Sequence, residues 1–221
     1  MEIDVDAFSL CKFEKLVIKD SDLIIRGFAF ACNEKANEII ISNSNVEMQQ
    51  NAFTDVGRDM EVTFTDCQIK MEKEVFKSSG VVSLTISGSE VEFGEESFEN
   101  CEDLVNVEIG ANNIRIGEGA FSDCWELKNF IIAEDSKDDD LEIYIDECAF
   151  KNSSVQNVVI GRGKATICKE AFKDCIDILS VELLGTSLEV EANAFDNCSD
   201  ELVIKYDGNQ YDKDSIESIN D

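Results

Sequence analysis

The segment Ala120-Phe121-Ser122-Asp123-Cys124-Trp125-Glu126-Leu127, followed by Phe130 and Ile132, recurs with variations along most of this 221-residue chain. Its phenylalanine marks each copy, because nine of the fourteen phenylalanines follow one another at intervals of 22 or 23 residues, with a single interval of 29. They are Phe8, Phe30, Phe53, Phe76, Phe98, Phe121, Phe150, Phe172 and Phe195. A period in the twenties predicts a solenoid, in which each repeat buries its apolar face against its neighbours.

Two apolar pairs flank each of these phenylalanines. Around Phe121 they are Ile114 with Ile116 before the ring, and Phe130 with Ile132 after it. Apolar residues that alternate with other residues predict a short, half-buried strand. We therefore expect two strands per repeat. The Ala-Phe segment between them is predicted to form a tight turn or a single helical turn that places the ring in the core.

The repeat resembles the BspA-like type of leucine-rich repeat, with its pattern Ala-Phe-x-x-Cys-x-x-Leu-x-x-Val-x-Ile and an Ile-x-x-x-Ala-Phe return. The match runs from about Ile3 to Tyr206. The resemblance implies a curved leucine-rich-repeat solenoid with a parallel sheet on its concave side, a role in adhesion or protein recognition, and no catalytic residues. The chain departs from the family in lacking the proline that often follows the concave strand, and its second to fourth repeats lack the cysteine three residues after the phenylalanine.

The organisation along the chain follows from the repeat. Residues 1–206 are predicted to form a solenoid of about nine repeats with an incomplete repeat at the N-terminus, and residues 207–221 a C-terminal cap or tail. The bare start suggests either that residues precede it or that another chain covers it. The long interval places an acidic insertion near residues 133–140. We interpret it as a solvated loop; calcium binding is the alternative, but the spacing matches no EF-hand.

Charge narrows the range of partners. With 48 acidic and 19 basic residues the chain has a formal charge of −29, which repels nucleic-acid phosphates and lipid headgroups. We expect no nucleic acid and no membrane insertion, and another protein as the partner, a basic one being a candidate. The absence of a signal peptide and the odd number of cysteines, nine, predict a cytoplasmic location. The cell surface is the alternative if the N-terminus has been truncated.

The side chains give little chemistry to work with. The chain has no histidine, so a cysteine nucleophile lacks an imidazole base, and we expect no cofactor, no metal site and no catalytic residue. The cysteines three residues after a repeat phenylalanine are predicted to be free thiols in a core ladder, because side chains on stacked turns point the same way. They are Cys11, Cys101, Cys124, Cys175 and Cys198.

A solenoid carbohydrate-active enzyme is the catalytic alternative. It requires two carboxylates at a working separation, and Glu108 and Glu182 are the carboxylates on the central outward row of the predicted concave sheet. Three repeats separate them, which is roughly 14 Å and too far for such a pair. The sequence therefore favours a protein that does not catalyse a reaction.

The concave sheet is the predicted binding surface, because solenoids contact partners through such rows. Its central outward row reads Val17, Ile40, Thr63, Thr85, Glu108, Ile131, Val159, Glu182 and Lys205. We expect Ile131 and Val159 to be exposed and, with Asn129 and Asn157 at their edge, to form a small apolar patch with a polar rim. Val17 and Ile40 complete the candidate binding residues.

Two other interpretations of this row remain open. Valine and isoleucine are good strand formers, so they are also expected on a surface that binds nothing. Separately, the open solenoid ends allow the chain to be a structural subunit that assembles through them, as an alternative to a protein-binding or adhesion scaffold.

Overall fold

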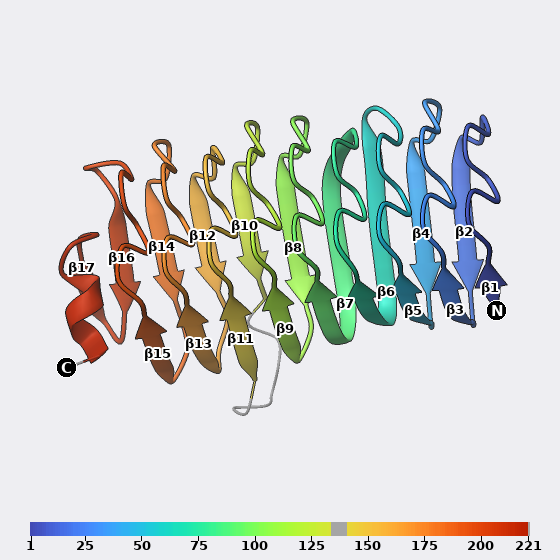
Figure 1. Ribbon diagram of the computed structural model, residues 1–221. Coiled ribbons are helices and arrows are strands. Elements are labelled where there is room, and N and C mark those ends of the chain that lie inside the picture. Colours follow the sequence, from blue (N-terminus) through green and yellow to red (C-terminus); the bar gives the residue numbers. More distant parts are fainter. Residues whose placement is uncertain (134–140, 221) are drawn as a thin grey trace.

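The computed structural model describes residues 1–133 and 141–220. The predicted acidic loop at residues 133–140, with its calcium alternative, therefore lies almost entirely outside the described residues. The chain forms a parallel β-solenoid of about nine turns, as predicted, and the turns stack in one row with the two ends of the chain at opposite ends (Figure 1).

Each turn contributes one strand to each of two parallel layers. The first layer contains the strands that follow the Ala-Phe segments: β2 (Lys15–Lys19), β4 (Glu38–Ser42), β8 (Asn106–Gly110), β10 (Asn129–Ile132), β12 (Asn157–Ile160), β14 (Ser180–Leu183) and β16 (Val203–Tyr206). The second layer contains the strands that precede them: β1 (Glu2–Ile3), β3 (Asp22–Ile25), β5 (Asn45–Met48), β9 (Asn113–Ile116), β11 (Glu142–Ile145), β13 (Lys164–Ile167) and β15 (Ser187–Val190). Two long strands, β6 (Met60–Met71) and β7 (Val81–Phe93), run through both layers and join them into one 17-stranded sheet.

Alternation along the strands separates core from surface. In β10 the burial alternates, so that Phe130 and Ile132 are fully buried while the residues between and before them face outward. Phe130 lies in register with Val107 on one side and Val158 on the other. Equivalent residues of successive repeats therefore stack directly on one another, and the inward rows form one continuous core.

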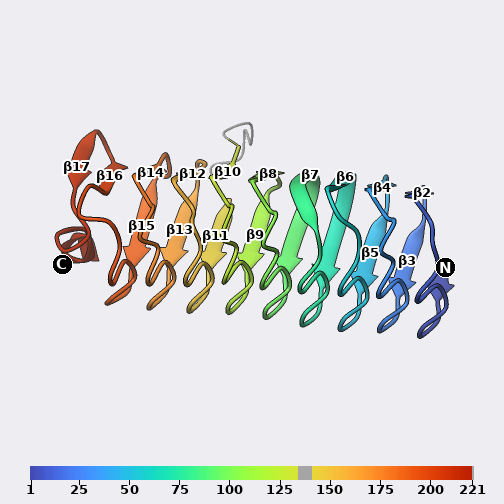
Figure 2. The same ribbon diagram turned by 90° about the horizontal axis from the view of Figure 1, so that it is seen from above.

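The Ala-Phe segments form hydrogen-bonded turns, which make a regular row of loops along one long edge of the solenoid (Figure 2). In each Ala-Phe turn two residues have a left-handed backbone. One lies two positions before the phenylalanine, as Gly119 does (φ 60°), and the other lies two positions after it, as Asp123 does (φ 55°). The turns also bond to each other, since the amide of Phe121 donates to the carbonyl of Ala149 at 2.7 Å. The hydrogen-bond ladder therefore continues outside the strands.

The nine repeat phenylalanines form a single stack of rings through the core. Neighbouring centroids are 4.8–5.4 Å apart and the rings are within 13° of parallel. Phe121 and Phe172 are fully buried in the middle of this stack. Phe8 is 46% exposed, because only one neighbouring ring covers it.

The position three residues after each phenylalanine has a polar function that the sequence analysis missed. Its side chain donates a hydrogen bond to the carbonyl of the phenylalanine in the preceding turn, as Cys124 does to Phe98 at 3.3 Å. Asn33 and Ser79, which occupy the position where the second and fourth repeats lack cysteine, make the same bond. Asn33 and Ser79 thus preserve the donor, whereas the third repeat has the apolar Val56 and the seventh has Ser153, whose hydroxyl lies 3.5 Å from the sulfur of Cys175.

The two ends of the solenoid differ. At the C-terminus β17 (Asn209–Tyr211) pairs antiparallel with β16, and the 3-10 helix η1 (Ile216–Asn220) places the fully buried Ile216 against the core. At the N-terminus β1 pairs with β3 alone among the described strands, and exposed apolar side chains lie nearby: Met1, Val5, Phe8 and Leu10. No helix among the described residues is long and apolar enough to cross a membrane.

Removing a ring from the middle of the stack is expected to cost more than removing the ring at its open end. Phe121→Ala should lower the free energy of unfolding by roughly 3–5 kcal/mol, since it leaves a cavity between two rings. Phe8→Ala should cost clearly less, because half of that ring is already in water. Denaturant unfolding of both variants makes the comparison, and equal losses would show that the stack does not hold the turns together.

The cysteines are expected to divide into one fast thiol, a slow set of six buried thiols, and the half-buried Cys32 and Cys148 between them. All nine are free; Cys11 is exposed, which corrects its predicted place in the core, whereas Cys101 and Cys198 are buried. Burial raises the pKa of Cys101 and of Cys198 to about 12, so the reactive thiolate is scarce at neutral pH.

Intact-mass measurement during alkylation tests this division. Under native conditions Cys11 should react first and the buried thiols should lag, and denaturation should release all nine. Fast labelling of Cys101, or a mass that indicates disulfides, would contradict the structure.

Candidate binding surface

The outward side of the first layer, which we call the first-layer face, brings the predicted binding residues together in two pairs. Ile131 lies in register with Val159, and Val17 with Ile40. Between the pairs the central row continues through Thr63 and Thr85 to Glu108. The row is therefore continuous, as the sequence predicted, and most of its members are β-branched.

The exposure of these residues differs from the prediction. Val17 is 44% exposed, but Ile40, Ile131 and Val159 are half-buried rather than exposed. Neighbouring turns are about 4.8 Å apart, so each branched side chain covers part of the next. Val17 is more exposed because it lies on the first strand of its layer and has a neighbouring strand on one side only.

Asn129 and Asn157 form a hydrogen-bonded ladder beside the Ile131–Val159 pair. Asn129 donates to the Oδ1 of Asn106 at 2.8 Å, and Asn157 donates to the Oδ1 of Asn129 at 3.2 Å. The hydroxyl of Ser180 continues the ladder by donating to Asn157 at 2.9 Å. These bonds hold the edge of the patch in a fixed geometry, and they leave the amides with further donors and acceptors for a partner.

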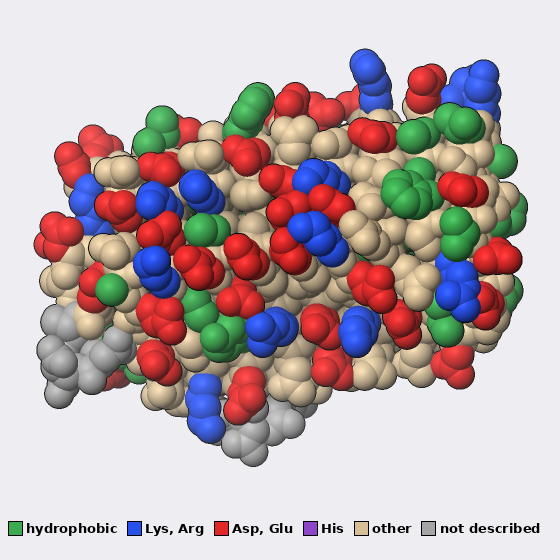
Figure 3. Space-filling view, viewed as in Figure 1, with side chains coloured by type: hydrophobic (Ala, Val, Ile, Leu, Met, Phe, Trp, Pro, Cys, Tyr) green, Lys and Arg blue, Asp and Glu red, His purple; other side chains and the backbone are tan. Residues whose placement is uncertain are grey.

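Charge is scarce on the part of this face that runs from β7 to β14. Its outward residues from β7 to β14 include only two charged side chains, Glu108 and Glu182, in a chain that is 30% charged. Over all the described first-layer strands it has three lysines and four glutamates, a net −1 against the formal −29 of the whole chain. The view in Figure 3 shows how densely acidic and basic side chains are mixed elsewhere.

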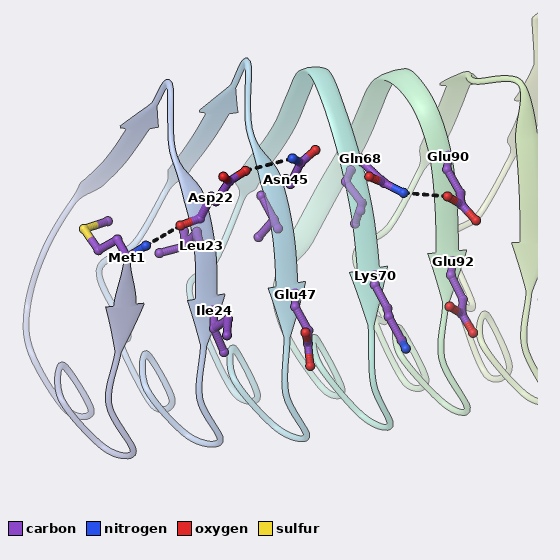
Figure 4. Close-up of a pocket in the computed structure, with 12 residues that line it drawn as sticks. Met1, Asp22, Leu23, Ile24, Asn45, Glu47, Gln68, Lys70, Glu90 and Glu92 are labelled. Atoms are coloured by element: carbon purple, nitrogen blue, oxygen red, sulfur yellow. Dashed lines mark hydrogen bonds between the residues drawn. The ribbon is translucent and has the colours of Figure 1, made fainter.

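A hollow of about 180 Å³ lies at the C-terminal end of the first-layer face, beside Glu182 and Lys205, and two larger ones lie over the second layer. A groove of about 680 Å³ runs over β1, β3, β5, β6 and β7, where Asp22, Asn45, Gln68 and Glu90 point outward from neighbouring strands (Figure 4). These side chains pair with each other, Asn45 donating to Asp22 at 2.8 Å and Gln68 to Glu90 at 2.6 Å. None of the predicted binding residues lines this groove.

A smaller groove of about 430 Å³ continues along the second layer past Arg115 and Tyr144. Arg115 contacts Asp146 at 2.8 Å and lies over the ring of Tyr144 at 4.9 Å. A hydrogen bond with Cys168 raises the pKa of Tyr144 to about 12, so the phenol stays protonated at neutral pH. Tyr144 is therefore a poor base, and we interpret its contact with Arg115 and Asp146 as structural.

Two arrangements considered from the sequence, a metal cluster and a carboxylate pair on the central row, can be checked among the described residues. No group of three or more His, Cys, Asp or Glu side chains within residues 1–133 and 141–220 is placed to hold a metal ion. Glu108 and Glu182 are separated by the turns of Ile131 and Val159, so three strand spacings lie between them. That is roughly 14 Å, and the two carboxylates do not form a catalytic pair.

Comparison with protein families agrees with this geometry. The BspA type leucine-rich repeat region, a six-copy family, matches residues 1–128 and 143–209, and the chain belongs to this family. Comparisons with curated proteins and with solved structures gave no match. The family consists in general of non-catalytic repeat scaffolds, so the surface rather than an active site is where function is to be sought.

Proposed function

We propose that this chain is a non-catalytic protein-binding scaffold whose binding surface is the first-layer face. The main support is the scarcity of charge on the part of that face from β7 to β14, because interface cores are depleted of charged residues relative to the rest of a protein surface. At its centre Ile131 and Val159 supply apolar contact, and the ladder through Asn129 and Asn157 supplies a preorganised polar rim. Preorganisation lowers the entropy lost on binding.

The charge of −29 favours a protein over a nucleic acid as the partner, since phosphates would be repelled. A basic protein would be steered toward the molecule by this field, even though the face itself is nearly neutral. The buried free thiols support a reducing, cytoplasmic compartment.

Assembly through a solenoid end is the second candidate. It is supported by the exposed apolar side chains near the N-terminal strand, among them Phe8 and Leu10. The C-terminal end is covered by η1 and β17, so such assembly would pair two N-terminal ends rather than build a continuous filament.

Placing two carboxylates on the patch should abolish binding and preserve the fold. We expect the double variant Ile131→Glu with Val159→Glu to lose the partners that the unmodified chain captures from its source organism. Thr166→Glu is the matched control, because Thr166 is a half-buried outward residue of the second layer.

Quantitative mass spectrometry of the captured proteins, with thermal melting of each variant, is the measurement. Partners lost from the double variant but kept by Thr166→Glu, at nearly unchanged melting temperatures, are the predicted result. Capture that survives in a folded double variant would move the interface off the first-layer face.

A further inference from the structure

We propose that the partner of the first-layer face is a second copy of this chain, packed face to face in a two-fold dimer. This inference rests on the proposed function, because it concerns the same surface. In this dimer the two solenoids run antiparallel, and β2 of one copy lies over β14 of the other.

The polar chemistry of the face is self-complementary. Hydroxyls and amides dominate its polar positions, as at Thr85, Asn106 and Asn129. Each of these groups both donates and accepts hydrogen bonds, so two identical surfaces can satisfy each other. A face of carboxylates could not do this, because it would offer acceptors alone.

Electrostatic repulsion leaves this face as the favourable route of approach. Each copy has a formal charge of −29, and like charges brought within about 10 Å are poorly screened at physiological salt. The eight first-layer strands that meet in this arrangement carry two lysines and four glutamates on the face, a net −2 per copy, so contact through them brings little like charge together. Contact through the second layer would instead oppose Asp22, Glu90 and their neighbours.

The antiparallel arrangement also places Glu182 near the lysines of β2, of which Lys15 is ion-paired within its own chain to Glu38. Lys15 and Lys19 lie on either side of Val17 in β2. With β2 over β14, Glu182 of the second copy faces Val17 and reaches between the two lysines. Glu108 then faces Thr85 rather than another Glu108. The opposite end of the dimer repeats these contacts by symmetry.

The face is large enough for a stable dimer. Eight strands at a spacing of about 4.8 Å, each about 16 Å wide over five residues, give roughly 600 Å² per copy. The total of roughly 1,200 Å² exceeds the ~1,000 Å² expected of a specific interface. The twisted layers would pack about 10 Å apart, as in other sheet-on-sheet contacts.

A charge swap tests the arrangement. Lys19→Glu and Glu182→Lys should each weaken the dimer roughly tenfold, because each opposes like charges at both ends of the interface. The double variant Lys19→Glu with Glu182→Lys should restore it. Glu108→Thr should tighten it, since a desolvated carboxylate is removed. Lys164→Glu, on the exposed side of the second layer, is the matched control and should leave the dimer unchanged.

Sedimentation velocity over a range of concentrations measures the monomer–dimer equilibrium of the unmodified chain and of all five variants. Circular dichroism confirms that each variant is folded. A dimer that follows this pattern supports the proposal. A monomer at every concentration overturns it, and so does a dimer that none of the face variants changes. If the chain is monomeric but Ile131→Glu with Val159→Glu still abolishes capture, the face binds a different protein and only the dimer is wrong.

Discussion

The stack of phenylalanine rings is the interaction on which the rest of this structure depends. Each ring covers the next at 4.8–5.4 Å, which is close to the ~4.8 Å between neighbouring strands. One spacing therefore satisfies ring packing and backbone hydrogen bonding together. Because the rings stack and the ladder bonds at the same repeat distance, equivalent residues of every turn are held in register, and like side chains on the surface form a continuous row.

The turn that delivers each ring places strict demands on its neighbours. Left-handed residues two before and two after the ring bend the chain, and residues such as Asn152 and Asp174 adopt this conformation at lower cost than branched ones. In most turns the carbonyl of the ring residue also accepts a hydrogen bond from a side chain of the following turn, which Cys, Ser or Asn supplies. The apolar Val56 of the third repeat shows that the position also tolerates a side chain that cannot donate.

The sequence predicts the fold well because the same pattern of apolar residues recurs in every repeat. The alternating pairs around Phe121 and the buried rings were predictable from one repeat. The half-burial of Ile131 and Val159 was not, because it depends on how far side chains on adjacent turns overlap. The grooves over the second layer, near Asp22 and Glu90, also depend on the shape of the stacked turns rather than on one residue pattern. The shared donor role of Asn33, Ser79 and Cys124 needs a defined acceptor, which only the three-dimensional structure supplies.

The proposed function rests on the contrast between a strongly acidic molecule and one nearly neutral face. The most direct test is paramagnetic relaxation of methyl groups by a soluble, uncharged agent, recorded at low and at high protein concentration. The account predicts that the methyls of Ile131 and Val159 lose relaxation enhancement as concentration rises, while the methyl of Thr166 on the second layer does not. Unchanged accessibility of the methyl groups of all three residues at every concentration, in the absence and in the presence of captured partners, would contradict it.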